Sequence, residues 1–147
     1  MMTEQIDTLQ VRRTLRCAPE RVFQAWTDPD QLQQWYAPSD DWSTPVAEVD
    51  LRVGGSYRIG LAAPGRAPFY EVGEFLEVAP PSRLVYTQRT EGGGSAEELV
   101  VSVEFIARDG ATEVVVTERG YTDARVRDLH RRGWEGFLAR LARVAGP

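Results

Sequence analysis

The sequence predicts an α+β fold in which a curved antiparallel sheet of six or seven strands wraps around one long C-terminal helix. Apolar side chains recur at i, i+3, i+4 and i+7 over residues 128–144, which is the pattern of an amphipathic helix. Before that segment, stretches of alternating apolar and polar residues follow one another at hairpin-length spacing. Because the apolar face of a sheet needs a cover, and this helix is the only long amphipathic element, we expect it to lie across that face.

A strand and two short helices are predicted at the start of the chain. The strand covers residues 9–16. Pro19 opens the first helix, because proline suits the first helical turn. Asp28 is a capping residue before the second helix, which extends to residue 37 and is followed by a polar loop over residues 38–45.

Six further strands are predicted, in pairs that are separated by turns rich in glycine and proline. Gly54-Gly55 joins the first pair, and Asp109-Gly110 joins the last. Hairpin-length connections favour an antiparallel sheet over βαβ units. We expect one domain over residues 1–147, because no linker or repeat divides the chain. The six strands are expected at residues 46–53, 57–62, 70–78, 83–90, 98–107 and 112–119, with a hairpin tip at 92–94.

Gly133 and Gly136 lie inside the predicted C-terminal helix. In a helix interior, each glycine costs roughly 1 kcal/mol relative to alanine. A helix that retains two glycines needs either the close approach of another backbone or free space beside it. The apolar stripe of this helix consists of His130, Trp134, Phe137, Leu138, Leu141 and Val144.

Asp109-Gly110 fixes the register of the last hairpin if it is a two-residue turn. Val101 then faces Glu118, and alternation places Glu118 on a face that is otherwise apolar. An unpaired buried carboxylate is costly, so we expect a partner for Glu118 or a raised pKa. Two interpretations stay open: an ion pair with an arginine or a contact with water near the open end of the sheet, or a polar anchor for a ligand. The buried face is predicted to carry Leu99, Val101, Val103, Phe105, Val114, Val116 and Glu118.

The preceding hairpin has two alternatives for its inner face. The first places Gly73, Phe75, Leu84 and Tyr86 inside, and the second places Val72, Leu76 and Val85 there. We favour the first, aromatic set.

Composition excludes several classes of function. The net charge of −5 argues against a nucleic-acid partner. No apolar run is long enough to span a membrane, so we expect no membrane insertion. Cys17 is the only cysteine, which fits a cytoplasmic location. All 17 basic residues are arginines, which excludes Schiff-base catalysis through a lysine.

The sequence shows no metal-binding or nucleophilic motif. His130 is the only histidine, and no HxH, HxxxH, CxxC or Gly-x-Ser-x-Gly pattern is present. We therefore expect no metal, no cofactor and no assigned catalytic residue, and we interpret His130 as a packing or capping histidine. The acidic residues Asp28, Asp30, Asp40 and Asp41 are interpreted as solvated capping and loop residues.

Short motifs in a fixed order cover residues 11–144. They are Ala18-Pro19-Glu20-Arg21-Val22-Phe23, Trp26-Thr27-Asp28-Pro29, Leu32-x-x-Trp35, Val53-Gly54-Gly55-Ser56-Tyr57, Pro80-Pro81-Ser82-Arg83-Leu84 and Gly133-Trp134-x-x-x-Leu138-x-x-Leu141. In this order and spacing, the chain resembles the START-like (SRPBCC) superfamily, and within it the family of heat-shock protein 90 ATPase activator homologues. The resemblance implies a helix-grip, Bet v 1-like fold, often with an apolar cavity between helix and sheet. Relatives include lipid and polyketide binders, cyclases, hormone receptors and co-chaperone domains, and they share no catalytic set that could be carried over.

Three functions follow from these observations and from the resemblance. The first, which we favour, is the binding of a small apolar or aromatic ligand, lipid- or polyketide-like, in a cavity between the sheet and the C-terminal helix. The second is an enzyme of the cyclase or hydratase type that uses Glu118 with a tyrosine or His130 for proton transfer. The third is a co-chaperone-like protein-interaction domain; a protein partner and a homodimer both stay open. The expected ligand-binding residues are Trp35, Tyr57, Ile59, Phe75, Tyr86, Val103, Phe105, Val116, Glu118, Trp134, Phe137 and Leu138.

Overall fold

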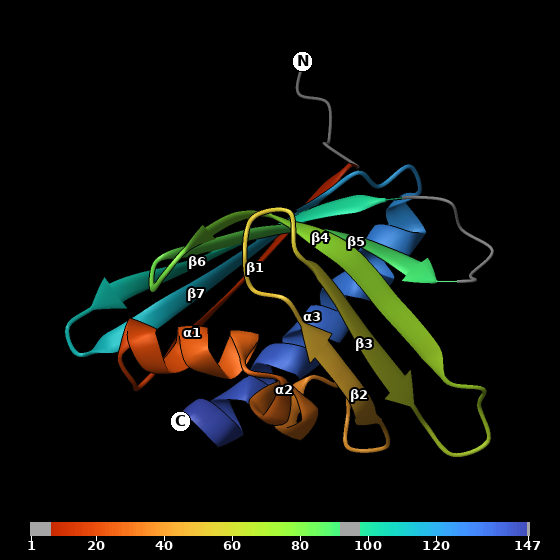
Figure 1. Cartoon of the computed structure of the whole chain (residues 1–147), viewed down its shortest axis with the longest axis horizontal. Coiled ribbons are helices and arrows are strands. Elements are labelled where there is room, and N and C mark those ends of the chain that lie inside the picture. Colours follow the sequence, from red (N-terminus) through yellow and green to blue (C-terminus); the bar gives the residue numbers. More distant parts are fainter. Residues whose placement is uncertain (1–6, 92–97, 147) are drawn as a thin grey trace.

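The computed structural model describes residues 7–91 and 98–146 of the chain (Figure 1). Within these ranges the chain forms seven strands and three helices. In chain order they are β1 (Thr8–Leu15), α1 (Pro19–Thr27), α2 (Pro29–Trp35), β2 (Ser43–Val49), β3 (Ser56–Ala62), β4 (Phe69–Ala79), β5 (Arg83–Glu91), β6 (Leu99–Arg108), β7 (Ala111–Arg119) and α3 (Ala124–Ala145).

The strands form one antiparallel sheet in the order β1-β7-β6-β5-β4-β3-β2. Figure 1 shows this sheet curving over α3, with α1 and α2 at the end where the C-terminus lies. The predicted α+β architecture is confirmed, including two short helices after the first strand. The hairpin tip predicted at residues 92–94 lies outside the described residues.

The register predicted from Asp109-Gly110 is confirmed. Both turn residues have positive φ, 48° and 82°, as a two-residue hairpin of the type I′ class requires. Arg108 pairs with Ala111 across this turn. All seven side chains predicted for the inner face of the hairpin are buried.

The aromatic alternative for the β4–β5 hairpin is also confirmed. Phe75, Leu84 and Tyr86 belong to the hydrophobic core, whereas Leu76 is 47% exposed. The register shifts after Phe75, where an irregularity interrupts the pairing of β4 with β5. The two valines of the alternative set are shielded on the opposite face of the sheet.

The boundaries of β2 differ from the prediction. The strand ends at Val49, so residues 50–55 form a longer loop and not a two-residue turn. It also begins at Ser43, inside the predicted polar loop. There the buried Thr44 hydroxyl donates to the backbone oxygen of Tyr36, which ties the start of β2 to the end of α2.

Helix α3 begins at Ala124, one turn earlier than predicted. Its start is set by Asp123, whose side chain accepts a hydrogen bond from the Arg125 N–H at 2.8 Å. The apolar pattern did not reveal this turn, because Val126 and Leu129 point to solvent, with 39% and 63% of their surface exposed. His130, which was predicted to be a packing or capping residue, lies inside α3 and therefore does not cap it.

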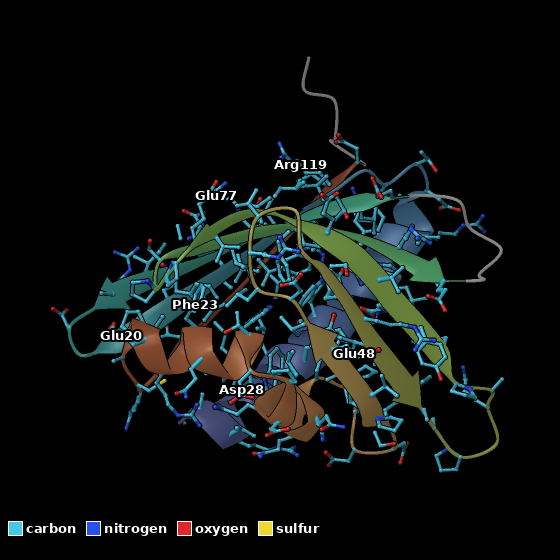
Figure 2. The ribbon with its side chains drawn as sticks, viewed as in Figure 1. Glu20, Phe23, Asp28, Glu48, Glu77 and Arg119 are labelled. Carbon is cyan, nitrogen blue, oxygen red and sulfur yellow. The ribbon has the colours of Figure 1, made fainter. Side chains whose placement is uncertain are left out.

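Aromatic side chains fill the space between α1 and the sheet. Figure 2 shows Phe23 on this side, with Glu77 and Arg119 on the opposite, convex face of the sheet. The Phe105 ring lies 5.4 Å from the ring of Phe23 and 5.8 Å from that of Trp26, both in edge-to-face geometry. This part of the interior is therefore densely packed.

The two glycines of α3 have different surroundings. A Cβ on Gly136 would overlap the carbonyl oxygen of Pro38, so the close approach of the loop requires glycine there. A Cβ on Gly133 would meet no atom within 4 Å. The two explanations expected from the sequence, close approach and free space, are both found, one at each glycine.

Candidate functional site

A cleft of about 520 Å³ opens between the first half of α3 and strands β4 and β5. Both walls carry aromatic rings: Trp42 and Phe69 meet edge to face at 5.5 Å, and Phe137 stacks on Tyr36 at 4.5 Å. The cleft is lined by Pro38, Trp42, Arg66, Phe69, Glu71, Gln88, Thr90, Leu129, His130, Arg132, Gly133, Trp134 and Phe137.

Glu71 lies at the floor of the cleft. It faces inward because it pairs with Ile59 of β3, whose side chain belongs to the core, and only 7% of its surface is exposed. Its Oε2 accepts hydrogen bonds from the Tyr36 hydroxyl at 2.8 Å and from Gln88 Nε2 at 2.7 Å. Burial raises the pKa of Glu71 to about 7, and the charge of Glu118 acts in the same direction.

Glu118 lies deeper, behind the α3 wall of the cleft, and none of its surface is exposed. Its Oε1 accepts hydrogen bonds from the Tyr121 hydroxyl and from Trp134 Nε1, the latter at 3.1 Å. The expectation that Glu118 has a partner is confirmed, but these partners are uncharged donors, and no arginine pairs with it among the described residues. Its Oε2 has no hydrogen-bond partner in this part of the chain.

His130 connects this buried group to the cleft. Its Nδ1 lies 2.8 Å from the Tyr121 oxygen and 3.6 Å from Glu118 Oε1. Burial raises the pKa of Tyr121 well above its usual value, so the hydroxyl keeps its proton and donates a hydrogen bond to Glu118. The Tyr121 oxygen then accepts from the Nδ1–H of His130, which fixes the ring orientation.

The residues predicted to bind a ligand occupy three different places. Trp134 and Phe137 line the cleft, with Glu118 directly behind them. A space of about 20 Å³, enough for about one water molecule, is bordered by Tyr57, Ile59, Phe75 and Tyr86. The remaining five, Trp35, Val103, Phe105, Val116 and Leu138, are at most 3% exposed and pack inside the core.

Several polar residues of the site were not identified from the sequence. Glu71 and Gln88 could have been, because alternation from Phe75 and from Tyr86 places each on the inner face. Tyr121 lies in the loop between β7 and α3, where no periodic pattern indicates which way a side chain points. The structure describes no group of three or more His, Cys, Asp or Glu residues that could hold a metal ion within residues 7–91 and 98–146.

Two of the four aspartates near α2, Asp28 and Asp40, have structural roles, which partly match the prediction. Asp28 caps α2, accepting from the Asp30 N–H at 3.0 Å. Asp40, which was expected to be only a solvated loop residue, pairs with Arg140 and Arg143 of α3 and so fastens the loop to the helix. These side chains lie outside the cleft.

A curled antiparallel sheet that grips a C-terminal helix defines this chain as a helix-grip, Bet v 1-like protein. Residues 16–146 match the family model described as Activator of Hsp90 ATPase homolog 1-like protein, and the chain belongs to that family. No helix among the described residues is long and apolar enough to cross a membrane.

Solved structures from several organisms share this fold. A protein from Chromobacterium violaceum is 28% identical, with a TM-score of 0.89 and coverage of 97% of this chain and 99% of that chain. An AHSA1-like protein from Aeromonas hydrophila is 31% identical, with a TM-score of 0.76 and coverage of 93% and 90%. An Hsp90 activator from Plasmodium falciparum, 24% identical over 92% of this chain and 94% of that chain, has a TM-score of 0.71 and shows likeness of fold. No curated protein matches this chain.

Proposed function

We propose that this protein binds a small molecule with an apolar or aromatic body and a polar head group in the cleft between α3 and strands β4 and β5. The observation that carries the proposal is the combination of volume and chemistry in one place. A cleft of about 520 Å³ is within the range of ligand sites, roughly 300–1,000 Å³, and it has aromatic walls and a hydrogen-bonded carboxylate at its floor.

The aromatic rings support this proposal because they are already held in place. Phe137 stacks on Tyr36, whose hydroxyl is bonded to Glu71, and Trp134 is anchored through its indole N–H to Glu118. A ligand would meet a surface that needs little ordering, which lowers the entropic cost of binding. The proposal includes a cytoplasmic location, in keeping with the single cysteine.

The test is a titration with Nile red, an uncharged dye that fluoresces in apolar sites, together with native mass spectrometry of freshly purified protein. Gly133→Leu is expected to abolish dye binding and any bound mass, because the new side chain extends into the cleft. Glu135→Leu is the matched control, since it adds the same side chain at an exposed position of α3. Equal binding by all three proteins would contradict the proposal.

A co-chaperone-like interaction is a second candidate. The family description supports it, and so do Val126 and Leu129, two exposed apolar side chains near the start of α3. It predicts that the protein changes the ATPase rate of purified Hsp90 and that Val126→Glu, which leaves the cleft lining unchanged, removes the effect.

Proton-transfer catalysis is supported only by the hydrogen bonds that link Glu118 through Tyr121 to His130. Of these three residues, His130 lines the cleft. It predicts turnover of a cyclase- or hydratase-type substrate that Glu118→Ala abolishes while the fold is kept. Unchanged ligand affinity without turnover would leave passive binding as the function.

A further inference from the structure

We infer that the cleft selects a molecule whose head group is a protonated amine, carried on an apolar or aromatic body. This inference rests on the proposed function and specifies the class of ligand for the same cleft. It follows from three features of the floor: the kind of polar atoms that lack partners, the uncompensated negative charge, and the aromatic walls.

The buried polar atoms that lack partners at the floor are hydrogen-bond acceptors. They are Gln88 Oε1, on a residue that lines the cleft, and Glu118 Oε2, which is fully buried behind the α3 wall and out of contact with a ligand in the cleft; neither has a partner among the described residues. Since a buried acceptor without a donor is unfavourable by roughly 1–3 kcal/mol, a head group that donates a hydrogen bond to Gln88 Oε1 is favoured. An alkylammonium group offers three N–H donors and no acceptor, whereas a carboxylate or phosphate head offers acceptors only.

The charge at the floor is negative and has little compensation. Glu71 is bonded to Tyr36 and Gln88, and Glu118 to Tyr121 and Trp134, all of which are uncharged. Among the described ion pairs, only His130, 3.6 Å from Glu118, is able to bring positive charge to either carboxylate. A ligand cation supplies the counter-charge that a buried carboxylate otherwise lacks.

The outer part of the cleft has the opposite charge, which limits the ligand to a single amine. Arg66 and Arg132 line the mouth and are exposed, with the Arg66 guanidinium 5.8 Å from the centre of the Trp42 ring. A second ammonium at that depth would be repelled, so a polyamine is disfavoured. The aromatic rings between mouth and floor suit an apolar body and also stabilise a cation that lies over their faces.

The protonation state of Glu71 provides an independent signature of ammonium binding. Burial raises the pKa of Glu71 to about 7, so the carboxyl group is partly protonated at neutral pH. An ammonium favours its ionised form, and binding therefore releases a proton and strengthens as pH rises from 6 to 8, while a primary amine stays protonated. The titratable groups around Glu71 are Tyr36, Tyr57, Tyr86, Tyr121, Glu118 and His130, and burial raises the pKa of each of these four tyrosines, which keeps them uncharged.

The experiment displaces Nile red with three matched probes: 3-phenylpropylamine, 3-phenylpropanol and 3-phenylpropanoate. We expect the amine to displace the dye at least about tenfold more strongly than the alcohol at pH 8, with the carboxylate weakest. The amine should also bind about tenfold more weakly at pH 6, where most Glu71 side chains are protonated. In Glu71→Gln, which retains an oxygen acceptor for the Tyr36 hydroxyl, the preference and the pH dependence should both disappear. Glu74→Gln, an exposed position on the same strand, should behave as the wild type.

Each other outcome overturns the inference in a way that separates it from the proposed function. Equal displacement by amine and alcohol, stronger displacement by the carboxylate, or an amine preference that survives in Glu71→Gln would each reject an ammonium site. Dye binding that Gly133→Leu blocks, but that no amine displaces, would reject the inference and leave the proposed function standing. Dye binding that Gly133→Leu does not affect would reject both. Thermal unfolding of Glu71→Gln followed by circular dichroism confirms that the variant is folded.

Discussion

The two ends of the contact between α3 and the sheet are built differently. At the closed end, around Leu138, the helix is buried and Gly136 lets the backbone of a neighbouring loop touch it. At the open end, around Gly133, the helix faces free space, and the strands opposite supply Glu71 and Gln88 where the closed end has apolar side chains. The comparison shows that one helix–sheet pair can form a solid core at one end and a polar cleft at the other through a few inward-facing residues.

Phe105→Ala tests whether the closed end is purely structural, and it has the largest expected effect. Phe105 is 3% exposed and packs against two other aromatic rings, so its loss should lower the free energy of unfolding by about 3–5 kcal/mol. Urea unfolding measures this change. Nile red binding to the folded variant should stay the same; a changed affinity would place the ligand in the interior, where the sequence predicted it.

Glu71→Gln tests whether the buried carboxyl group at the open end lowers the stability of the folded protein when it is ionised. The pKa of Glu71 is raised from 4.5 to about 7 in the folded protein, so the folded state binds more protons than the unfolded state between these values. Wild-type stability therefore falls as pH rises through this window, by about 2–3 kcal/mol between pH 5 and pH 8. Relative to wild type, Glu71→Gln should gain that amount over the same interval, measured by urea unfolding at both pH values. A constant difference between the two proteins would show that Glu71 does not titrate in this window.

Gly136→Ala and Gly133→Ala compare the same substitution at the two ends. At the closed end, the new methyl group would overlap the Pro38 carbonyl oxygen, and the free energy of unfolding should fall by roughly 1–3 kcal/mol. Denaturant unfolding is the measurement. An unchanged or higher stability would mean that the loop moves away from α3 without cost.

Gly133→Ala is expected to have the smallest effect, and of opposite sign. The methyl group meets no neighbour, so the better helix propensity of alanine should raise the free energy of unfolding by up to about 1 kcal/mol. Because the methyl group enters the cleft, Nile red should bind more weakly. A thermal unfolding curve and a dye titration on the same sample measure both effects; a loss of stability would show that the space beside this glycine is filled.

Much of the fold was predictable because it depends on local patterns. Asp109-Gly110 requires a turn with two positive φ angles, so a single dipeptide fixed the register of β6 and β7 and the inward position of Glu118. Strand alternation from Phe75 and from Tyr86 also places Glu71 and Gln88 on the inner face of the sheet. Neither residue is apolar, so the pattern of apolar residues alone does not mark either as part of a site.

The cleft itself was not predictable, because it depends on distances between segments far apart in the chain. Its position results from the contact of Gly136 with Pro38 at one end of α3 and the absence of such a contact at Gly133. Nothing in the sequence showed whether the interior would be filled, and five of the predicted lining residues pack into the core. The orientation of Tyr121 likewise depends on the loop that leads into α3.

The position of β1 beside β7 has a consequence for the order of folding. All other neighbouring strands are consecutive in the chain, whereas β1 pairs with β7, and the contacting residues Gln10 and Thr117 are 107 positions apart. Closing so long a loop carries an entropic penalty that a hairpin does not, so the meander from β2 to β7 is expected to assemble before β1 docks. Leu9 of β1 pairs with Glu118, so this last step also completes the surroundings of the buried carboxylate.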